Sequence, residues 1–128
     1  MTYALDASAV IAHLDAGDGH HDAVGGLLHR IAGERLVAHP LTVAECLVAA
    51  VRAGRGGAMV AAIAAMRVEV VESGGNGSLR LAELRVATGL RMPDCCAVEV
   101  AERHEAVLVT FDARQARAAR QLGITVEP

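Results

Sequence analysis

The sequence predicts an α/β fold: a three-layer sandwich in which helices cover both faces of a mainly parallel central sheet. Short apolar runs of strand length alternate along the 128-residue chain with segments whose apolar residues recur at helical spacing. Most segments between successive strands are long enough for one or two helices. Parallel strands require crossovers of that length, so the pattern favours a parallel sheet.

The first half of the chain is expected to contain two strands and four helices. A buried strand at Tyr3–Leu5 ends on Asp6, and Ser8 is placed to cap the helix that follows. A glycine-broken loop leads to the second helix, and Pro40 ends the second strand. The elements expected after the first helix are a helix at Asp22–Ala32, a strand at Arg35–His39, and helices at Leu41–Ala53 and Ala58–Met66.

The second half is expected to continue in the same way. Pro93 suits the first turn of a helix, and Asp112 is placed to open the last one, which Gly123 ends. The strongest strand pattern in the chain is Ala106–Thr110. The other elements are strands at Val68–Val71 and Ile124–Val126, and helices at Leu79–Thr88, Pro93–His104 and Asp112–Leu122.

Length and composition indicate a single domain spanning residues 1–128, with a core built from aliphatic side chains. Hydrophobic residues make up 53% of the chain, but Tyr3 and Phe111 are its only aromatic residues. No apolar run approaches the roughly 20 residues that span a bilayer, and the N-terminus lacks the features of a signal peptide. We therefore expect a cytoplasmic protein that makes no membrane contact.

The cysteines and basic residues exclude several kinds of function. Cys46, Cys95 and Cys96 are odd in number and have neither disulfide nor zinc spacing, so they are expected to be small apolar residues in a reducing compartment. All twelve basic residues are arginines, and the net charge of −3 argues against bulk attraction to nucleic acid. A local patch of arginines that binds nucleic acid is still compatible with this composition and net charge.

Four carboxylates occupy comparable places, at strand ends and in early helical turns: Asp6, Glu45, Asp94 and Asp112. Each has a structural explanation by itself. Glu45 stands at capping-box spacing from Thr42, Asp94 suits a helix dipole, Asp112 suits an N-cap and Asp6 suits a turn. A parallel sheet, however, would bring all four toward one crevice. Clustered carboxylates repel unless a cation lies among them, and oxygen-only ligands suit Mg²⁺ or Mn²⁺, which most often act on phosphate esters.

The motifs around these acids resemble those of the PIN-domain ribonucleases, and in particular the small VapC-type toxins of bacterial toxin–antitoxin pairs. The resemblance covers essentially the whole chain. It lies in four motifs taken together: Leu5-Asp6-Ala-Ser8-Ala-Val-Ile, Thr42-Val-Ala-Glu45, Met92-Pro93-Asp94-Cys-Cys-Ala and Val109-Thr110-Phe-Asp112. It implies a Rossmann-like α/β/α sandwich and a Mg²⁺-dependent endoribonuclease, with Mn²⁺ as a substitute. It also implies a VapB-like antitoxin, a cytoplasmic RNA substrate, and a homodimer that forms a heterotetramer or larger assembly with the antitoxin.

The same resemblance assigns roles to individual residues. Asp6 and Asp94 match the principal metal ligands, and Glu45 matches the acid that completes the site or holds a second ion. Asp112 matches the fourth acid, which acts directly or through water. The small hydroxyl residues that orient carboxylates or phosphate correspond to Ser8 and Thr110. The implied reaction is in-line attack of an activated water on phosphorus, leaving 5′-phosphate and 3′-hydroxyl ends.

One departure from the family pattern and several arginines bear on RNA binding. Phe111 stands where many relatives have Asn or Arg, so a polar contact to substrate is expected to be missing there. Arg91, Arg114 and Arg117 lie near the acids in sequence and are candidates to hold the RNA backbone. An ordinary solvated helix face is the alternative explanation for each of them.

Two other functions compete with this interpretation. Receiver domains and haloacid-dehalogenase-like phosphatases also combine an α/β fold with an acidic Mg²⁺ pocket. Both depend on a lysine, which this chain lacks, and the first motif here is Asp-x-Ser rather than Asp-x-Asp. The second alternative is a catalytically inactive PIN-like module that binds RNA or protein. Acids at all four positions favour the enzyme over that module.

Overall fold

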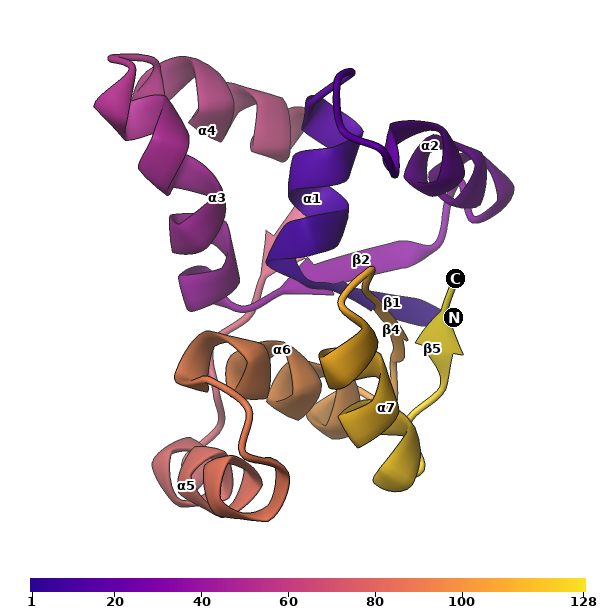
Figure 1. Ribbon diagram of the computed structural model, residues 1–128, viewed down its shortest axis with the longest axis vertical. Coiled ribbons are helices and arrows are strands. Elements are labelled where there is room, and N and C mark those ends of the chain that lie inside the picture. The colour runs from indigo at the N-terminus through magenta and orange to yellow at the C-terminus, as the bar shows by residue number, and fades with distance from the viewer.

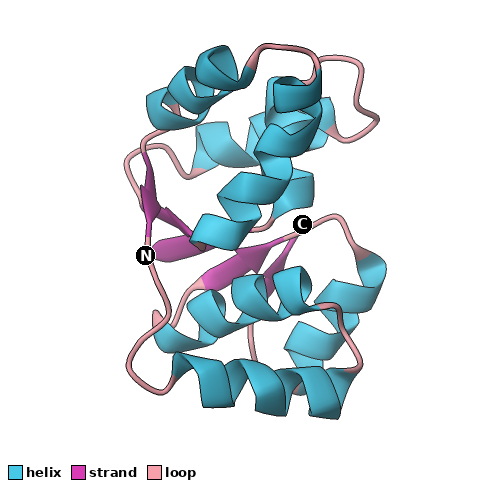
Figure 2. Ribbon diagram, turned by 90° about the vertical axis from the view of Figure 1, so that its left-hand side faces the viewer, coloured by secondary structure: helices cyan, strands magenta, loops and turns pink.

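Five parallel strands form the central sheet of the computed structural model, which describes residues 1–128 (Figure 1). The strands are β1 (Thr2–Leu5), β2 (Arg35–Ala38), β3 (Val68–Val70), β4 (Val107–Val109) and β5 (Val126–Glu127). The helices are α1 (Ala7–Leu14), α2 (His21–Arg30), α3 (Pro40–Arg52), α4 (Gly56–Ala65), α5 (Gly77–Thr88), α6 (Met92–Arg103) and α7 (Ala113–Gln121). The sheet lies between two groups of helices, as the side view shows, so the α/β/α prediction is confirmed (Figure 2).

The strand order β3-β2-β1-β4-β5 makes β1 the centre of the sheet. The chain builds outward from β1 through β2 to β3, and then returns to add β4 and β5 on the other side of β1. The register places Tyr3 beside Leu36 on one flank and beside Val107 on the other. This reversal creates a topological switch point at the carboxyl ends of β1 and β4, where open α/β sheets form their binding crevices.

Each face of the sheet has its own aliphatic core, because successive strand residues point to opposite faces. Ala4 and Leu108 pack with helices α5, α6 and α7 on one face. Leu5 and Val109 pack with helices α1, α2, α3 and α4 on the other. Both cores consist largely of Ala, Val, Leu and Ile, as the composition predicts. Burying the carboxyl-terminal residues of β1 and β4 in this way fixes the positions of the residues that follow them.

The predicted cap of α1 is wrong, and the capping box considered as an alternative explanation for Glu45 does not form. Asp6, and not Ser8, is the N-cap of α1; its Oδ1 accepts a hydrogen bond from the Ala9 N–H at 2.9 Å. Thr42 and Glu45 form no capping box, because α3 begins three residues earlier than such a box requires, with His39 as its N-cap. Glu45 therefore lies in the second turn of α3, and its carboxylate does not cap the helix.

Smaller differences concern the last strand and the cysteines. The last strand is Val126–Glu127 instead of Ile124–Val126, since the Ile124 N–H donates to the carbonyl of Ala119 and closes α7. The cysteines are free and buried, as predicted. Burial is the main reason that the pKa of Cys46 rises to about 12, which makes its thiol a weak nucleophile. None of the helices combines the length and the apolar character needed to cross a membrane.

The role of His39 as a helix cap leads to a testable prediction about how the stability of the fold depends on pH. Its Nδ1 accepts from the Leu41 N–H at 3.0 Å, so the ring proton lies on Nε2, 3.0 Å from the Ser73 hydroxyl. Burial is the largest influence on the pKa of His39 and lowers it, while Glu99 and Glu72 act in the opposite direction and Arg103 reinforces the shift. The folded protein thus binds this proton more weakly than the unfolded chain, and stability should decrease as the pH falls through the ordinary histidine range.

Urea unfolding at about pH 8 and about pH 5 measures this effect. His39→Ala should cost about 1 kcal/mol at the higher pH through loss of the cap. His39→Asn keeps a capping side chain that does not titrate, so it should lose less stability than the wild type on acidification. Equal losses in the wild type and His39→Asn would contradict the assignment.

Candidate active site

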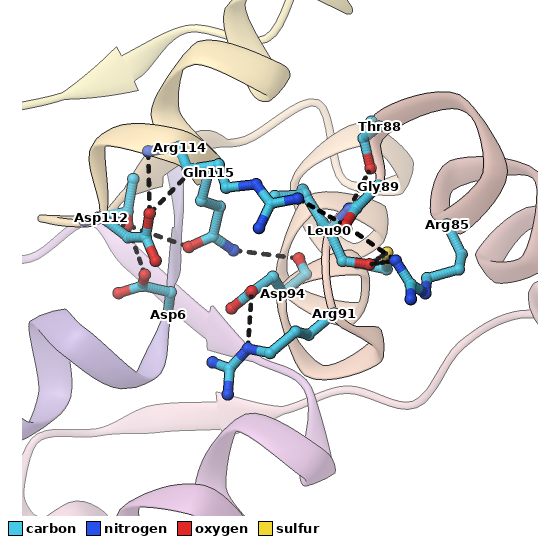
Figure 3. A network of polar contacts seen from close by, with 12 residues as sticks. Asp6, Arg85, Thr88, Gly89, Leu90, Arg91, Asp94, Asp112, Arg114 and Gln115 are labelled. Carbon is cyan, nitrogen blue, oxygen red and sulfur yellow. Dashed lines mark hydrogen bonds and ion pairs between the residues drawn. The ribbon is translucent and has the colours of Figure 1, made fainter.

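The four predicted carboxylates surround the switch point at the carboxyl ends of β1 and β4. Asp6 directly follows β1, and Asp112 follows β4 after a two-residue turn. Asp94 lies in the first turn of α6 and Glu45 in the second turn of α3. Figure 3 shows Asp6, Asp112 and Asp94 arranged around the side chain of Gln115. Residues separated by more than 100 positions in the chain thus meet at one edge of the sheet.

Asp6 is the most deeply fixed of the four acids. Its side chain is buried, with 5% of the residue exposed. Oδ1 accepts from the Ser8 hydroxyl at 2.7 Å as well as from the Ala9 N–H, and Oδ2 is hydrogen-bonded to the Thr110 hydroxyl. Ser8 also accepts from the Phe111 N–H at 3.0 Å. The two predicted hydroxyl residues therefore join α1 to the segment after β4 through this carboxylate.

Asp112 is exposed and caps α7. Its Oδ1 accepts from the N–H groups of Arg114 and Gln115, at 2.9 and 3.1 Å, while its own N–H donates to the Thr110 hydroxyl. Phe111, between Thr110 and Asp112, stacks its ring on that of His20, with ring centroids 4.4 Å apart. That ring offers no hydrogen bond to a substrate.

Asp94 and Glu45 form the second half of the site, together with one arginine. The Asp94 side chain is 17% exposed, and its Oδ2 lies 3.5 Å from Nε of Arg91, whose own side chain is 70% exposed. Burial is the main cause that raises the pKa of Glu45 above its ordinary value. Arg91 acts against this shift, whereas the charges of Asp94 and Asp6 add to it.

The electrostatic influences link the two halves. Burial raises the pKa of Asp6, and hydrogen bonds from Ser8, Thr110 and Ala9 only partly oppose it; the charge of Asp112 raises it further. The negative charge of Asp112 thus acts on Asp6, and the charges of Asp94 and Asp6 act on Glu45. Such mutual repulsion is what a bound cation would relieve.

The donor chemistry of the site suits a hard divalent cation, but the spacing limits how one can be held. The donors are carboxylate oxygens without a thiolate or imidazole among them, as Mg²⁺ and Mn²⁺ prefer. No three His, Cys, Asp or Glu side chains lie close enough together to share an ion. The arrangement therefore fits an ion that keeps several waters and contacts one or two carboxylates directly, as Mg²⁺ usually does.

The candidate RNA-binding arginines occupy different settings. Arg91 stands beside Asp94, and Arg117 is exposed on α7. The Nη2 of Arg114 donates to the Gly89 carbonyl at 2.9 Å, and Arg85 donates to the same carbonyl, so these two guanidinium groups brace the turn before α6 (Figure 3). Arg114 consequently has a structural contact in addition to any role toward a substrate.

Sequence reasoning missed Gln115, which is fully buried and lies between the two halves of the site. It stands three residues after the cap Asp112, where a glutamine ordinarily suggests a capping box. The pattern would have predicted a bond back to the Asp112 N–H, but Thr110 occupies that N–H. The side chain is instead bonded to Thr110 and to the backbone of Asp94.

A groove opens beside the acids. Helices α1, α3 and α4 enclose a hollow of about 550 Å³ lined mostly by apolar side chains. Ile11 and Leu14 lie along it, Glu45 stands in its wall, and Arg55 is its one basic residue. The groove thus leads from an apolar surface to one of the four acids.

The raised pKa of Asp6 predicts that Asp6→Asn stabilises the metal-free protein. Because the folded state holds this proton more tightly than the unfolded chain, stability decreases as the pH rises from the ordinary aspartate pKa through the raised value. Asparagine carries no charge and avoids that loss. In melting curves recorded with a chelator at neutral pH, we expect the melting temperature to rise by a few degrees, and the gain should shrink in acid. Destabilisation at every pH would instead indicate that the charged carboxylate is needed as a cap.

Comparison with known proteins identifies the family. A model of the PIN domain matches residues 3–121. None of the curated proteins compared with the chain matches it. Several solved structures share its fold. The structure of VapBC2 from Rickettsia felis, bound to a DNA fragment from its promoter, has a TM-score of 0.76 at 17% identity, covering 99% of this chain and 98% of that one.

Two further structures are similar over most of their length. FitAcB from Neisseria gonorrhoeae has a TM-score of 0.75 at 15% identity, covering 100% of this chain and 97% of that chain. VapC20 from Mycobacterium tuberculosis, described as a sarcin-ricin loop cleaving toxin, has a TM-score of 0.74 at 18% identity, with 92% and 95% covered. At these identities the likeness establishes the fold. The family match spans nearly the whole chain, and the chain therefore belongs to the PIN domain family.

Proposed function

We propose that this PIN domain is a Mg²⁺-dependent endoribonuclease of the VapC toxin type, inhibited by a cognate antitoxin. The observation that carries the proposal is the placement of four acids at the switch point: Asp6 after β1, Asp112 before α7, Asp94 in the first turn of α6 and Glu45 in the second turn of α3. The fold likeness to VapC20, described as a sarcin-ricin loop cleaving toxin, supports both the toxin assignment and RNA as the substrate.

Asp6 and Asp94 are the proposed metal ligands, with Glu45 and Asp112 acting directly or through water. Asp6 is well suited because three hydrogen bonds hold its carboxylate in one orientation. A bound Mg²⁺ or Mn²⁺ supplies an acidified water as nucleophile and stabilises charge on the leaving oxygen.

Glu45 is the best candidate to accept the proton of the attacking water. Its pKa is raised, chiefly by burial, so it is a stronger base than an ordinary glutamate. It is half-buried and makes no hydrogen bond or ion pair with a protein side chain. Attack in line with the leaving 3′-oxygen gives 5′-phosphate and 3′-hydroxyl ends.

Arg91 is the proposed contact to the RNA backbone nearest the reacting phosphate. It is largely exposed, and its Nε lies 3.5 Å from Asp94, too far for a strong hydrogen bond. A phosphate oxygen beside Asp94 would therefore meet a guanidinium whose N–H donors are still available to bind it. Arg114 and Arg117 would extend the contact along α7, and a protein of net charge −3 needs such local attraction to bind RNA.

The antitoxin is proposed to occupy the groove between α1, α3 and α4. Its apolar lining fits the apolar face of a helical peptide, and Glu45 in the wall lets that peptide extend an arginine or lysine toward the acids. Assembly as a homodimer, and as a heterotetramer or larger complex with antitoxin in the cytoplasm, belongs to the same proposal.

Asp94→Asn should lower RNA cleavage by orders of magnitude while the fold survives, because it removes one charged oxygen and keeps the shape of the side chain. Cleavage of a mixed RNA pool in Mg²⁺, and in Mn²⁺, measures the loss. Glu83→Gln is the matched control, since it removes one negative charge from the exposed face of α5 and should cleave like the wild type.

Wild-type cleavage rates in Asp94→Asn would show that the site is misassigned. If the wild type bound RNA but did not cleave it in either metal, the alternative function, an inactive PIN-like binding module, would replace the nuclease.

Ala49→Glu tests the partner. Ala49 lines the groove, and a buried carboxylate there should disrupt an apolar peptide contact. Co-expression with the product of the adjacent open reading frame should yield a complex that survives moderate salt with the wild type and is lost with Ala49→Glu. Ala87→Glu, on the exposed face of α5, is the control and should still co-purify. Failure of the wild type to co-purify, with growth arrest unrelieved, would reject the toxin assignment and leave the nuclease assignment standing.

A further inference from the structure

Gln115 is a fully buried polar side chain near the acids to which the proposed function gives no role. It is the third residue of α7 and is 0% exposed. Both ends of its amide are bonded: Oε1 lies 3.0 Å from the Thr110 hydroxyl, and Nε2 lies 3.0 Å from the backbone carbonyl oxygen of Asp94 (Figure 3). Burial of an amide is tolerated only when such partners are present.

The chemistry of these partners fixes the orientation of the amide. A carbonyl oxygen can only accept a hydrogen bond, so Nε2 must face Asp94 and Oε1 must face Thr110. The Thr110 hydroxyl also accepts from the Asp112 N–H, and its single proton is shared between Oε1 of Gln115 and the carboxylate of Asp6. A continuous chain of contacts therefore runs from Asp6 through Thr110 and Gln115 to the backbone of Asp94.

This chain connects parts of the site that come from different elements. Asp6 caps α1 after β1, and Asp94 is in α6; no hydrogen bond joins them directly. The side chain of Gln115 reaches from α7 into the space between them and contacts both sides (Figure 3). A shift of the amide would move the first turn of α6 relative to the Thr110 hydroxyl that orients Asp6.

We propose that Gln115 is a positioning residue that sets the placement of Asp94 relative to Asp6 for binding a divalent ion. The inference rests on the proposed function, because it assumes that these two acids are the ligands. Groups that orient metal ligands from behind typically affect metal affinity 10- to 100-fold when they are changed. We expect a loss in that range when the two bonds of Gln115 are removed.

The test measures Mn²⁺ affinity by electron paramagnetic resonance, which requires no RNA and no turnover. Gln115→Met keeps the length of the side chain and removes both hydrogen bonds, and should weaken Mn²⁺ binding at least about 10-fold. Gln115→Asn keeps the amide but is one methylene shorter, so it cannot make both bonds; it should also weaken binding and serves if Gln115→Met does not fold. Gln121→Met, exposed on the same helix, is the control and should bind like the wild type.

A double-mutant cycle separates positioning from a general loosening of the fold. If Gln115 acts through Thr110, the losses of Mn²⁺ affinity in Thr110→Val and Gln115→Met should be less than additive in the double variant. Wild-type affinity in a folded Gln115 variant, or fully additive losses, would overturn the inference while leaving the proposed metal site intact. If the wild type itself bound no Mn²⁺, the proposed function would fail, and this inference with it.

Discussion

The burial of the Asp6 carboxylate is the constraint on which the rest of the site depends. An ionised carboxylate away from water is costly unless hydrogen bonds compensate it, and three groups do so here: Ser8, Ala9 and Thr110. The compensation is incomplete, since the pKa of Asp6 is raised. The Asp6 carboxylate is therefore held in a fixed place, and a nearby cation would further stabilise its charged form.

The hydrogen bonds that the Asp6 carboxylate accepts determine the local structure around it. It serves α1 as a cap, so the helix begins immediately after the central strand. Its bond to Thr110 requires β4 to lie beside β1, which the order of the strands provides. The same threonine receives the Asp112 N–H and leads through Gln115 to α6. One buried acid is in this way tied to the switch point, to α7 and to the helix that carries Asp94.

Much of this arrangement can be predicted from the sequence, because it depends on local patterns. The strand ending at Asp6 and the helix opening at Asp112 follow from apolar periodicity and capping chemistry. The caps of α1 and α3 could not be assigned from the sequence, because several residues near each helix start can accept an N–H and tertiary packing decides which one does. His39 is such a case: its ring is bonded to Ser73, on a loop more than 30 residues away.

Gln115 could not be assigned from sequence for the same reason, since both of its partners lie outside its own helix. The groove beside Glu45 likewise depends on how three helices pack, which periodicity alone does not determine.

The central claim is that four acids from four elements form one divalent metal site. Anomalous diffraction from crystals grown with Mn²⁺ tests it most directly, because it locates the ion without relying on activity. We expect an anomalous peak at the carboxyl ends of β1 and β4, within coordination distance of the carboxylate of Asp6 or Asp94, with the other acids around it. A peak elsewhere, or none at saturating Mn²⁺, would show that the four acids do not form one metal site.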